Sequence, residues 1–392
     1  MDKKNEITMT TLLGEIKFYL AGTGTATINW GDGSESLVHF DDNEGRELHH
    51  KFSDRIERTI TITGENTCTA HEVRGITELN CRNNTLMKLD VSRNAALKKL
   101  ECRFNHLIEL DVSQNTALEY LGCYNNLLTT LDLRRNTALK MLDCGGNPLA
   151  KLDVSRLVAL TELCCNLNKL RKLDLSKNVA LTRLDCSDNQ ITRLNLSNNP
   201  ALIRLECCEN KLAALDMSQN PALEVLICHE NQLKSLDVRQ NDALTRLLCF
   251  DNKLKELDVN KNTALIDLAC WNNKLTELEV SQNIALKYLG CDNNQLTALD
   301  VSQNTTLLML FCSNNQLTEL DVSQNVTLEH LYCHVNQLTA LDVSRNTALK
   351  NLECHENSIS DIYVWEGFNL PKRRGKKDGY MKDDNAQFVV KK

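Results

Sequence analysis

The sequence has few aromatic residues, no long apolar run and no excess of basic residues. Aromatic residues make up 5% of the 392 residues and hydrophobic residues 42%, so any core must be mainly aliphatic. No stretch approaches the ~18–20 consecutive apolar residues of a membrane span, and we therefore expect none. The formal net charge is -7. This charge argues against a nucleic-acid scaffold, because such a scaffold needs a basic stripe to hold phosphates.

Sequence signals of enzymes are missing as well. No glycine-rich phosphate loop follows an expected strand, and neither an H-E-x-x-H motif nor a C-x-x-C pair occurs. No Ser, His and Asp set lies in a context that predicts a pocket. We therefore predict a protein without enzymatic activity and without a cofactor. Residues 1–11 show no apolar run of a secretory signal, so the sequence leaves the localisation open.

A repeat dominates what is present. From Ile76 onward the unit L-x-x-L-x-C-x-x-N-x-L-x-x-L-D-φ-x-x-N-x-x occurs fourteen times, with a period of 21 residues and no insertion or deletion. A period of this length with this leucine spacing indicates a solenoid, in which each coil buries its apolar side against its neighbours. Counted from the first leucine, positions 1, 4, 6, 11, 14 and 16 are apolar and are expected to point inward. Alternation across positions 3 to 7 predicts a short strand, and stacked coils join these strands into one parallel sheet.

Cysteine occupies position 6 of every repeat. Fourteen of the 17 cysteines lie there: Cys81, Cys102, Cys123, Cys144, Cys165, Cys186, Cys207, Cys228, Cys249, Cys270, Cys291, Cys312, Cys333 and Cys354. A disulfide framework does not space its cysteines regularly along a solenoid, whereas a free thiol behaves as a small buried hydrophobe. We predict reduced core thiols, with metal or disulfide roles as the alternative. Cys164 and Cys208 fall on outward positions, where they are expected to be accessible. The thiol ladder favours a reducing cytoplasm, and a secreted or surface location remains open if a leader was removed.

Asparagine occupies two further positions. Position 9 is Asn in all fourteen copies, from Asn84 to Asn357, and position 19 is Asn from Asn94 to Asn346 except at Leu157. Inward amides repeated at every turn predict ladders that satisfy buried backbone groups. Asp at position 15 and Ser at position 17 are expected to tie turns.

These motifs resemble the leucine-rich repeat family, with L-x-x-L-x-C-x-x-N-x-L in place of L-x-x-L-x-L-x-x-N-x-L. The nested half-motif L-x-x-L-D-V-x-x-N is similar to the short bacterial 21-residue variety, sometimes called IRREKO. The resemblance implies a right-handed solenoid with a concave parallel sheet that binds ligands. Because the half-motif is short and β-prone, we expect gentle curvature and no convex α-helix.

Both ends depart from the repeat, and we predict three parts: 1–72, 73–362 and 363–392. Residues 1–72 alternate over Ile7–Thr11, Glu15–Leu20, Thr25–Trp30, Leu37–Phe40 and Arg58–Thr63, which predicts a β-sandwich cap. The run Thr27–Ser34 resembles the polycystic-kidney-disease-type (PKD-like) module, and Gly31-Asp32-Gly33 is expected to form a tight turn. Tyr363–Phe368 and Gln387–Val390 predict a β cap with a hairpin around the basic run 371–377, which we interpret as a solvated loop.

Positions 3, 5, 7 and 8 are expected to face outward from the concave sheet. Consecutive strands place apolar and aromatic residues there, where exposure to water is costly and partner binding is favoured. The predicted partner-binding stripe comprises Ile227, Leu248, Phe250, Trp271, Tyr288, Met309, Phe311, Tyr332 and His334. Phe104, Tyr120 and Tyr124 form a smaller secondary patch.

Three hypotheses follow for this surface. We favour recognition of a protein partner by a monomer, with self-association through the stripe as one alternative. The other is a structural or adhesive surface protein that binds glycan or host matrix. His330, His334 and His355, with Glu353 and Glu356, form a weak candidate metal set, because zinc accepts such nitrogen and oxygen ligands. An adventitious surface cluster is the interpretation that the sequence favours, so no metal site is predicted.

Overall fold

The computed structural model describes residues 5–40, 45–64, 68–69, 72–73, 75–369 and 379–391. The chain divides into two compact units, Met1–Asn199 and Pro200–Lys392. The described residues contain strands and turns and no α-helix. The fourteen repeats form a β-solenoid with one coil per repeat, as predicted. The predicted basic run 371–377 lies outside the described residues.

Two antiparallel sheets form the start of the first unit. The strand order of one is β10-β1-β6-β3-β4, and in the other β2 pairs with both β5 and β9. The bounds are β1 (Asn5–Thr11), β2 (Glu15–Gly22), β3 (Gly24–Asn29), β4 (Glu35–Phe40), β5 (Arg46–Lys51), β6 (Arg58–Gly64), β7 (Cys68–Thr69), β8 (Glu72–Val73), β9 (Ile76–Asn80) and β10 (Lys88–Asp90). The five predicted strands are present, and β5 was not predicted as a strand.

This amino-terminal segment continues directly into the first coil. β1 pairs with β10 and β2 pairs with β9, so both strands of the first repeat have a backbone partner in the amino-terminal segment. Gly31 and Gly33 have φ of 78° and 90°, which confirms the tight turn around Asp32. The assignment of this segment to the PKD-like module stays a prediction.

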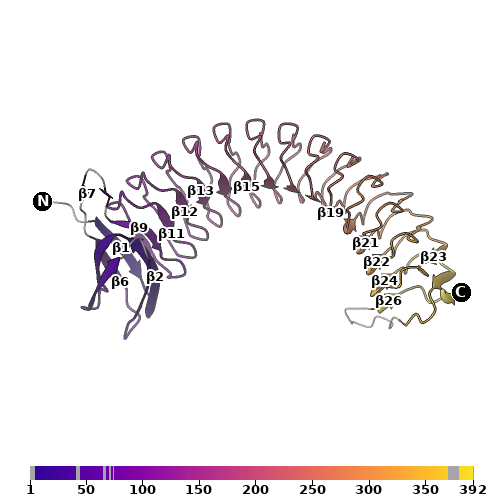
Figure 1. Cartoon of the computed structure of the whole chain (residues 1–392), viewed down its shortest axis with the longest axis horizontal. Helices are drawn as coiled ribbons and strands as arrows, with labels where there is room; N and C mark the ends of the chain where they lie inside the picture. The colour runs from indigo at the N-terminus through magenta and orange to yellow at the C-terminus, as the bar shows by residue number, and fades with distance from the viewer. Residues whose placement is uncertain are drawn as a thin grey trace. The chain divides into compact units, whose positions relative to one another are not determined.

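Each coil of the first unit then adds one short parallel strand (Figure 1). The strands are β11 (Lys99–Glu101), β12 (Tyr120–Gly122), β13 (Met141–Asp143), β14 (Glu162–Cys164) and β15 (Arg183–Asp185). Each residue pairs with the residue 21 positions later, as Leu100 pairs with Leu121. Residues at one position of the repeat therefore line up as a row along the sheet.

The second unit repeats this arrangement. Its strands are β16 (Arg204–Glu206), β17 (Val225–Ile227), β18 (Arg246–Leu248), β19 (Asp267–Ala269), β20 (Tyr288–Gly290), β21 (Met309–Phe311), β22 (His330–Tyr332), β23 (Ala340–Asp342), β24 (Asn351–Glu353), β25 (Asp361–Val364), β26 (Gly379–Met381) and β27 (Gln387–Val390). β26 extends the long sheet by pairing parallel with β24, and β27 pairs parallel with β25.

The predicted carboxy-terminal hairpin is therefore wrong. A hairpin needs antiparallel partners, whereas β25 and β27 run in the same direction. Residues 379–391 instead make one more coil, with β26 on the long sheet and β27 on a separate three-stranded sheet with β23 and β25. Both strands shield the last full repeat in the way that another repeat would.

The inward register is confirmed. All fourteen position-6 cysteines are buried and free, with exposed fractions of 0–1%. The leucines at positions 1 and 4 are buried around them, as Leu223 and Leu226 are around Cys228. The core is thus a column of aliphatic and thiol side chains in which each layer contacts the next.

The position-9 amides form the predicted ladder. Asn189 Nδ2 donates to the carbonyl oxygens of Cys165 (3.0 Å) and Cys186 (3.1 Å), and its Oδ1 accepts from the backbone N–H of Leu170 (2.9 Å). One Asn side chain thus forms hydrogen bonds with backbone groups of two coils. Hydrogen bonds between strands cannot reach these backbone groups. At position 15, Asp300 Oδ1 accepts from the Ser302 N–H (2.8 Å), which confirms the turn role.

A residue with left-handed backbone conformation precedes every position-9 asparagine. Position 8 has φ between 49° and 61° in all fourteen coils, and only Gly146 is glycine there. The conformation turns the chain out of the strand and into the ladder. Asn and Asp tolerate it best among non-glycine residues, which accounts for residues such as Asn272 and Asp251 at this position.

Candidate functional site

The predicted stripe lies on the outward face of the long parallel sheet in the second unit. Positions 3, 5 and 7 of successive coils form three rows on this face, because each strand pairs in register with the next. The predicted residues are half-buried, except Ile227, which is 8% exposed, and Tyr288, which is 38% exposed. Side chains of positions 5 and 7 thus cover the sheet beside one another.

Three rings form one continuous stack on the position-7 row. The ring centroids of His229 and Phe250 are 4.1 Å apart with an interplanar angle of 7°. Those of Phe250 and Trp271 are 4.0 Å apart at 18°. Both faces of Phe250 are therefore covered, and the stack presents ring edges outward. His229 was missed by the sequence reasoning, although its position in the row could have identified it.

A second ring pair lies on the position-5 row. Phe311 and Tyr332 stack at 4.8 Å with an interplanar angle of 10°. Between this pair and the first stack the position-5 residues are small, namely Ala269 and Gly290. Trp271 leans over Gly290, because a Cβ built on this glycine would lie 2.8 Å from Trp271 Cε3.

The small residues leave a hollow in the sheet face. Its volume is about 400 Å³, and its lining consists of Arg246, Asp267, Leu268, Ala269, Trp271, Tyr288, Leu289, Gly290 and Phe311. Rings therefore wall the hollow, while backbone and small side chains floor it. An apolar side chain of a partner could enter there and replace water at three aromatic surfaces.

Charged groups flank the hollow. Arg246 Nε and Asp267 Oδ2 form an ion pair at 3.0 Å. Asp292 follows Trp271 on the position-7 row, and its Oδ1 accepts from the backbone N–H of Ser313 (3.0 Å). Burial raises the pKa of Asp292 to about 6, although this hydrogen bond opposes the rise. The carboxylate thus carries a charge in a setting that disfavours it.

Only two of the three residues in the secondary patch contact each other through their rings. Phe104 is 45% exposed and meets Tyr124 edge-on at 5.5 Å. Tyr120 belongs instead to a polar network: its hydroxyl donates to Glu101 Oε2 (2.8 Å) and accepts from Arg103 Nη2 (2.7 Å). Alternation places Tyr120 on the same face as Tyr124, but its hydroxyl decides its partners.

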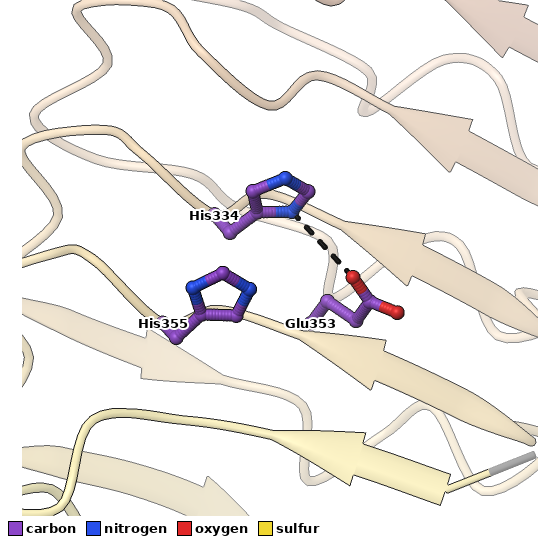
Figure 2. A group of neighbouring side chains, drawn as sticks. All are labelled: His334, Glu353 and His355. Carbon is purple, nitrogen blue, oxygen red and sulfur yellow. Dashed lines mark ion pairs between the residues drawn. The ribbon is translucent and has the colours of Figure 1, made fainter. Parts of the chain in front are cut away.

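The predicted histidine set is also divided. His334 and His355 stack at 4.7 Å with an interplanar angle of 15°, and His334 Nδ1 lies 3.8 Å from Glu353 Oε2 (Figure 2). His330 lies outside this group, because the Asn351 amide donates to its Nδ1 (2.8 Å). Glu356 contacts His355 Nδ1 at 3.2 Å and is exposed.

Two features bear on catalysis. Ser313 Oγ and His334 Nδ1 are 2.9 Å apart, but Glu353 approaches the same ring nitrogen. A Ser-His-acid triad needs the acid and the serine on opposite ring nitrogens, so this group does not have that geometry. Cys164 is half-buried, and burial with nearby carboxylates raises its pKa to about 11, which disfavours the nucleophilic thiolate.

No helix among the described residues has the length and apolar character needed to cross a membrane.

Comparison with known proteins found similar solved structures over most of the chain. InlJ from Listeria monocytogenes, whose functional domain includes a cysteine ladder, is 37% identical with a TM-score of 0.70, covering 74% of this chain and 74% of that one. A leucine-rich repeat protein of Leptospira interrogans is 27% identical with a TM-score of 0.62, covering 69% and 81%.

A more distant similarity is to the leucine-rich repeat ectodomain of the membrane receptor kinase GASSHO1/SCHENGEN3 from Arabidopsis thaliana. It is 19% identical with a TM-score of 0.59, covering 76% of this chain and 45% of that one, and it shows the fold alone. No protein-family model matches the chain, and comparison with curated proteins gave no match. The 21-residue period, the inward cysteines and the similarity to InlJ agree: the chain belongs to the leucine-rich repeat family, in the bacterial variety with cysteine and asparagine ladders.

Proposed function

We propose that the outward sheet face of Pro200–Lys392 binds a protein partner, with the aromatic stripe at its centre. The observation that carries this proposal is the hollow of about 400 Å³ between Trp271, Tyr288 and Phe311. Solenoids of stacked repeats offer extended surfaces on which many short strands contribute contacts. The Arabidopsis ectodomain of this fold was solved in complex with Casparian strip integrity factor 2, which supports a binding role for proteins of this fold.

Energetics favour the hollow as an anchor point. Large rings dominate interface energy, and the strongest contacts are apolar anchors in well-packed central pockets. The stack of His229, Phe250 and Trp271 holds its rings in place before a partner arrives. A preorganised surface loses little side-chain entropy on binding, so more of the contact energy remains as affinity.

A protein partner explains the ring geometry better than a glycan does. Sugar rings pack their C–H groups on exposed aromatic faces, whereas both faces of Phe250 are covered, by His229 at 4.1 Å and by Trp271 at 4.0 Å. The accessible ring edges and the hollow suit an inserted apolar side chain. The carboxylate of Asp292, which follows Trp271 on the position-7 row, favours a basic residue near that anchor.

Binding by variant proteins tests this proposal. The immobilised chain and its Phe250→Ala and Trp271→Ala variants are used to capture proteins from an extract of the source cells, and the captured protein is purified for titration. Ile284→Ala is the matched control, because Ile284 lies in the same coil as Trp271, is 61% exposed and lies outside the sheet face. We expect a direct complex that each ring variant weakens by ~30-fold or more, and that the control leaves unchanged.

Two outcomes would reject the proposal. One is equal affinity of all variants for the purified partner, with the fold intact by circular dichroism. The other is binding of a purified glycan instead of a protein, with the same dependence on Trp271, which would favour the adhesive alternative.

A further inference from the structure

Two neighbouring strands bring two imidazoles and one carboxylate together near the end of the long sheet. Glu353 ends β24, and His355 follows two residues later on the same face, because side chains alternate along an extended chain. Tyr332 of β22 pairs with Glu353. This register places His334, two residues after Tyr332, beside His355 (Figure 2).

The distances suit a shared ligand. One potential ligand atom from each of His334, Glu353 and His355 lies within 4.8 Å of the other two. His334 Nδ1 and Glu353 Oε2 are 3.8 Å apart. Ligands bound tetrahedrally to zinc at ~2.0–2.1 Å are ~3.4 Å apart, so the side chains must rotate to close the set. The two imidazoles must also leave their stack, because a metal bond to imidazole lies in the ring plane.

The surroundings bear on how these groups would bind a metal. Ser313 Oγ lies 2.9 Å from His334 Nδ1, so zinc would bind the other ring nitrogen of His334 or replace this hydrogen bond. Glu353 is 8% exposed. A divalent cation between the three side chains would pair with this nearly buried carboxylate.

We propose that His334, Glu353 and His355 form a binding site for a divalent transition-metal ion of the zinc type. Two nitrogens and one oxygen match the ligands that zinc accepts, and three protein ligands leave an open position for water or for a ligand from a partner. The site adjoins Tyr332 at the end of the aromatic stripe. It is independent of the hollow, so either proposal can fail without the other.

Calorimetric titration of the full chain with Zn²⁺ alone, in oxygen-free buffer without thiols, tests the site. We expect one zinc ion per chain. Loss of a residue that merely supports a metal ligand weakens metal affinity ~10–100-fold, so His334→Gln and His355→Gln should each weaken zinc binding by ~100-fold or more. His330→Gln is the matched control: this histidine lies on the same strand as Tyr332 but bonds to Asn351, and its loss should leave zinc affinity unchanged.

Cobalt spectroscopy and melting curves complete the test. Co²⁺ should give a weak visible band without thiolate charge transfer, because the ladder cysteines are buried. Zinc should raise the melting temperature of the wild type and of His330→Gln, but not of His334→Gln or His355→Gln. Absence of stoichiometric binding, retained affinity in the double variant His334→Gln/His355→Gln, or a thiolate band would overturn the proposal. Metal-free melting of each variant establishes that it is folded.

Discussion

The indole of Trp271 occupies the space that a side chain on Gly290 would need. A Cβ at residue 290 would lie 2.8 Å from Trp271 Cε3 and 3.1 Å from its Cζ3. The glycine thus lets the ring lean across the sheet and wall the hollow.

Gly290→Ala should displace this ring and weaken partner binding by ~10-fold, because the anchor pocket loses its shape. The free energy of unfolding should change by less than ~1 kcal/mol, since the clash is with the movable end of a surface side chain. Titration with the purified partner and urea unfolding measure the two effects. Unchanged affinity would mean that the hollow is not part of the interface.

Asp292→Asn should raise stability at neutral pH. The pKa of Asp292 is raised to about 6 from 3.8, so between these values the folded chain binds more protons than the unfolded chain. The free energy of unfolding therefore falls as pH rises through this window, by up to ~3 kcal/mol for this group. We expect the variant to gain ~1–3 kcal/mol at pH 7.5 and nothing at pH 3.5. Equal changes in the free energy of unfolding at both pH values would contradict the raised pKa of Asp292.

The two asparagine ladders should differ in their contribution to stability. Asn189 Oδ1 accepts from the Leu170 N–H (2.9 Å), whereas Asn178 Oδ1 is buried without a hydrogen bond and only its Nδ2 donates, to Val154 and Leu157. We expect Asn189→Leu to cost ~1–3 kcal/mol, because it leaves a buried N–H unpaired. Asn178→Leu should cost less, since the preceding coil already has leucine at that position. The urea midpoints of the two variants measure this difference. A larger loss of stability in Asn178→Leu than in Asn189→Leu would refute the ladder argument.

Val335→Asn should stabilise the chain. Val335 has φ of 55°, a left-handed conformation that is costly for a β-branched residue, while Asn272, Asn293 and Asn314 occupy the same position in preceding coils. Relief of this strain should add ~1 kcal/mol to the free energy of unfolding. Asn314→Val is the reciprocal variant and should lose a similar amount. A stabilising Asn314→Val would show that φ is not the cause.

Thiol labelling should separate the two classes of cysteine. Burial raises the pKa of Cys249 and of Cys354 to about 12, and position-6 thiols have almost no exposed surface. In a Cys68→Ser background, a thiol reagent should modify only Cys164 and Cys208 in the folded chain, and modify Cys164 slowly. All ladder cysteines should react in urea. Rapid modification of Cys249 without urea would show that the core opens locally.

Much of the site followed from position in the repeat. Phe250, Trp271 and Tyr332 lie where alternation placed them, and Cys228 and Cys312 are inside. His229 was missed, although it lies on the same row as Phe250, one coil earlier. Tyr120 and His330 could not be assigned from position, because their polar atoms bond to Glu101 and Asn351, and such partners depend on side-chain rotation.

The 21-residue period by itself determined the coil, the inward cysteines and the two amide ladders. Each residue meets its own copy in the next coil, so one repeat specifies all the others. The tertiary structure alone decided which outward side chains act together. The hollow depends on Trp271 turning toward Gly290, and the candidate metal group on His334 turning toward Glu353. It also decided the parallel pairing of β27, because residues after 362 have no repeat from which a register follows.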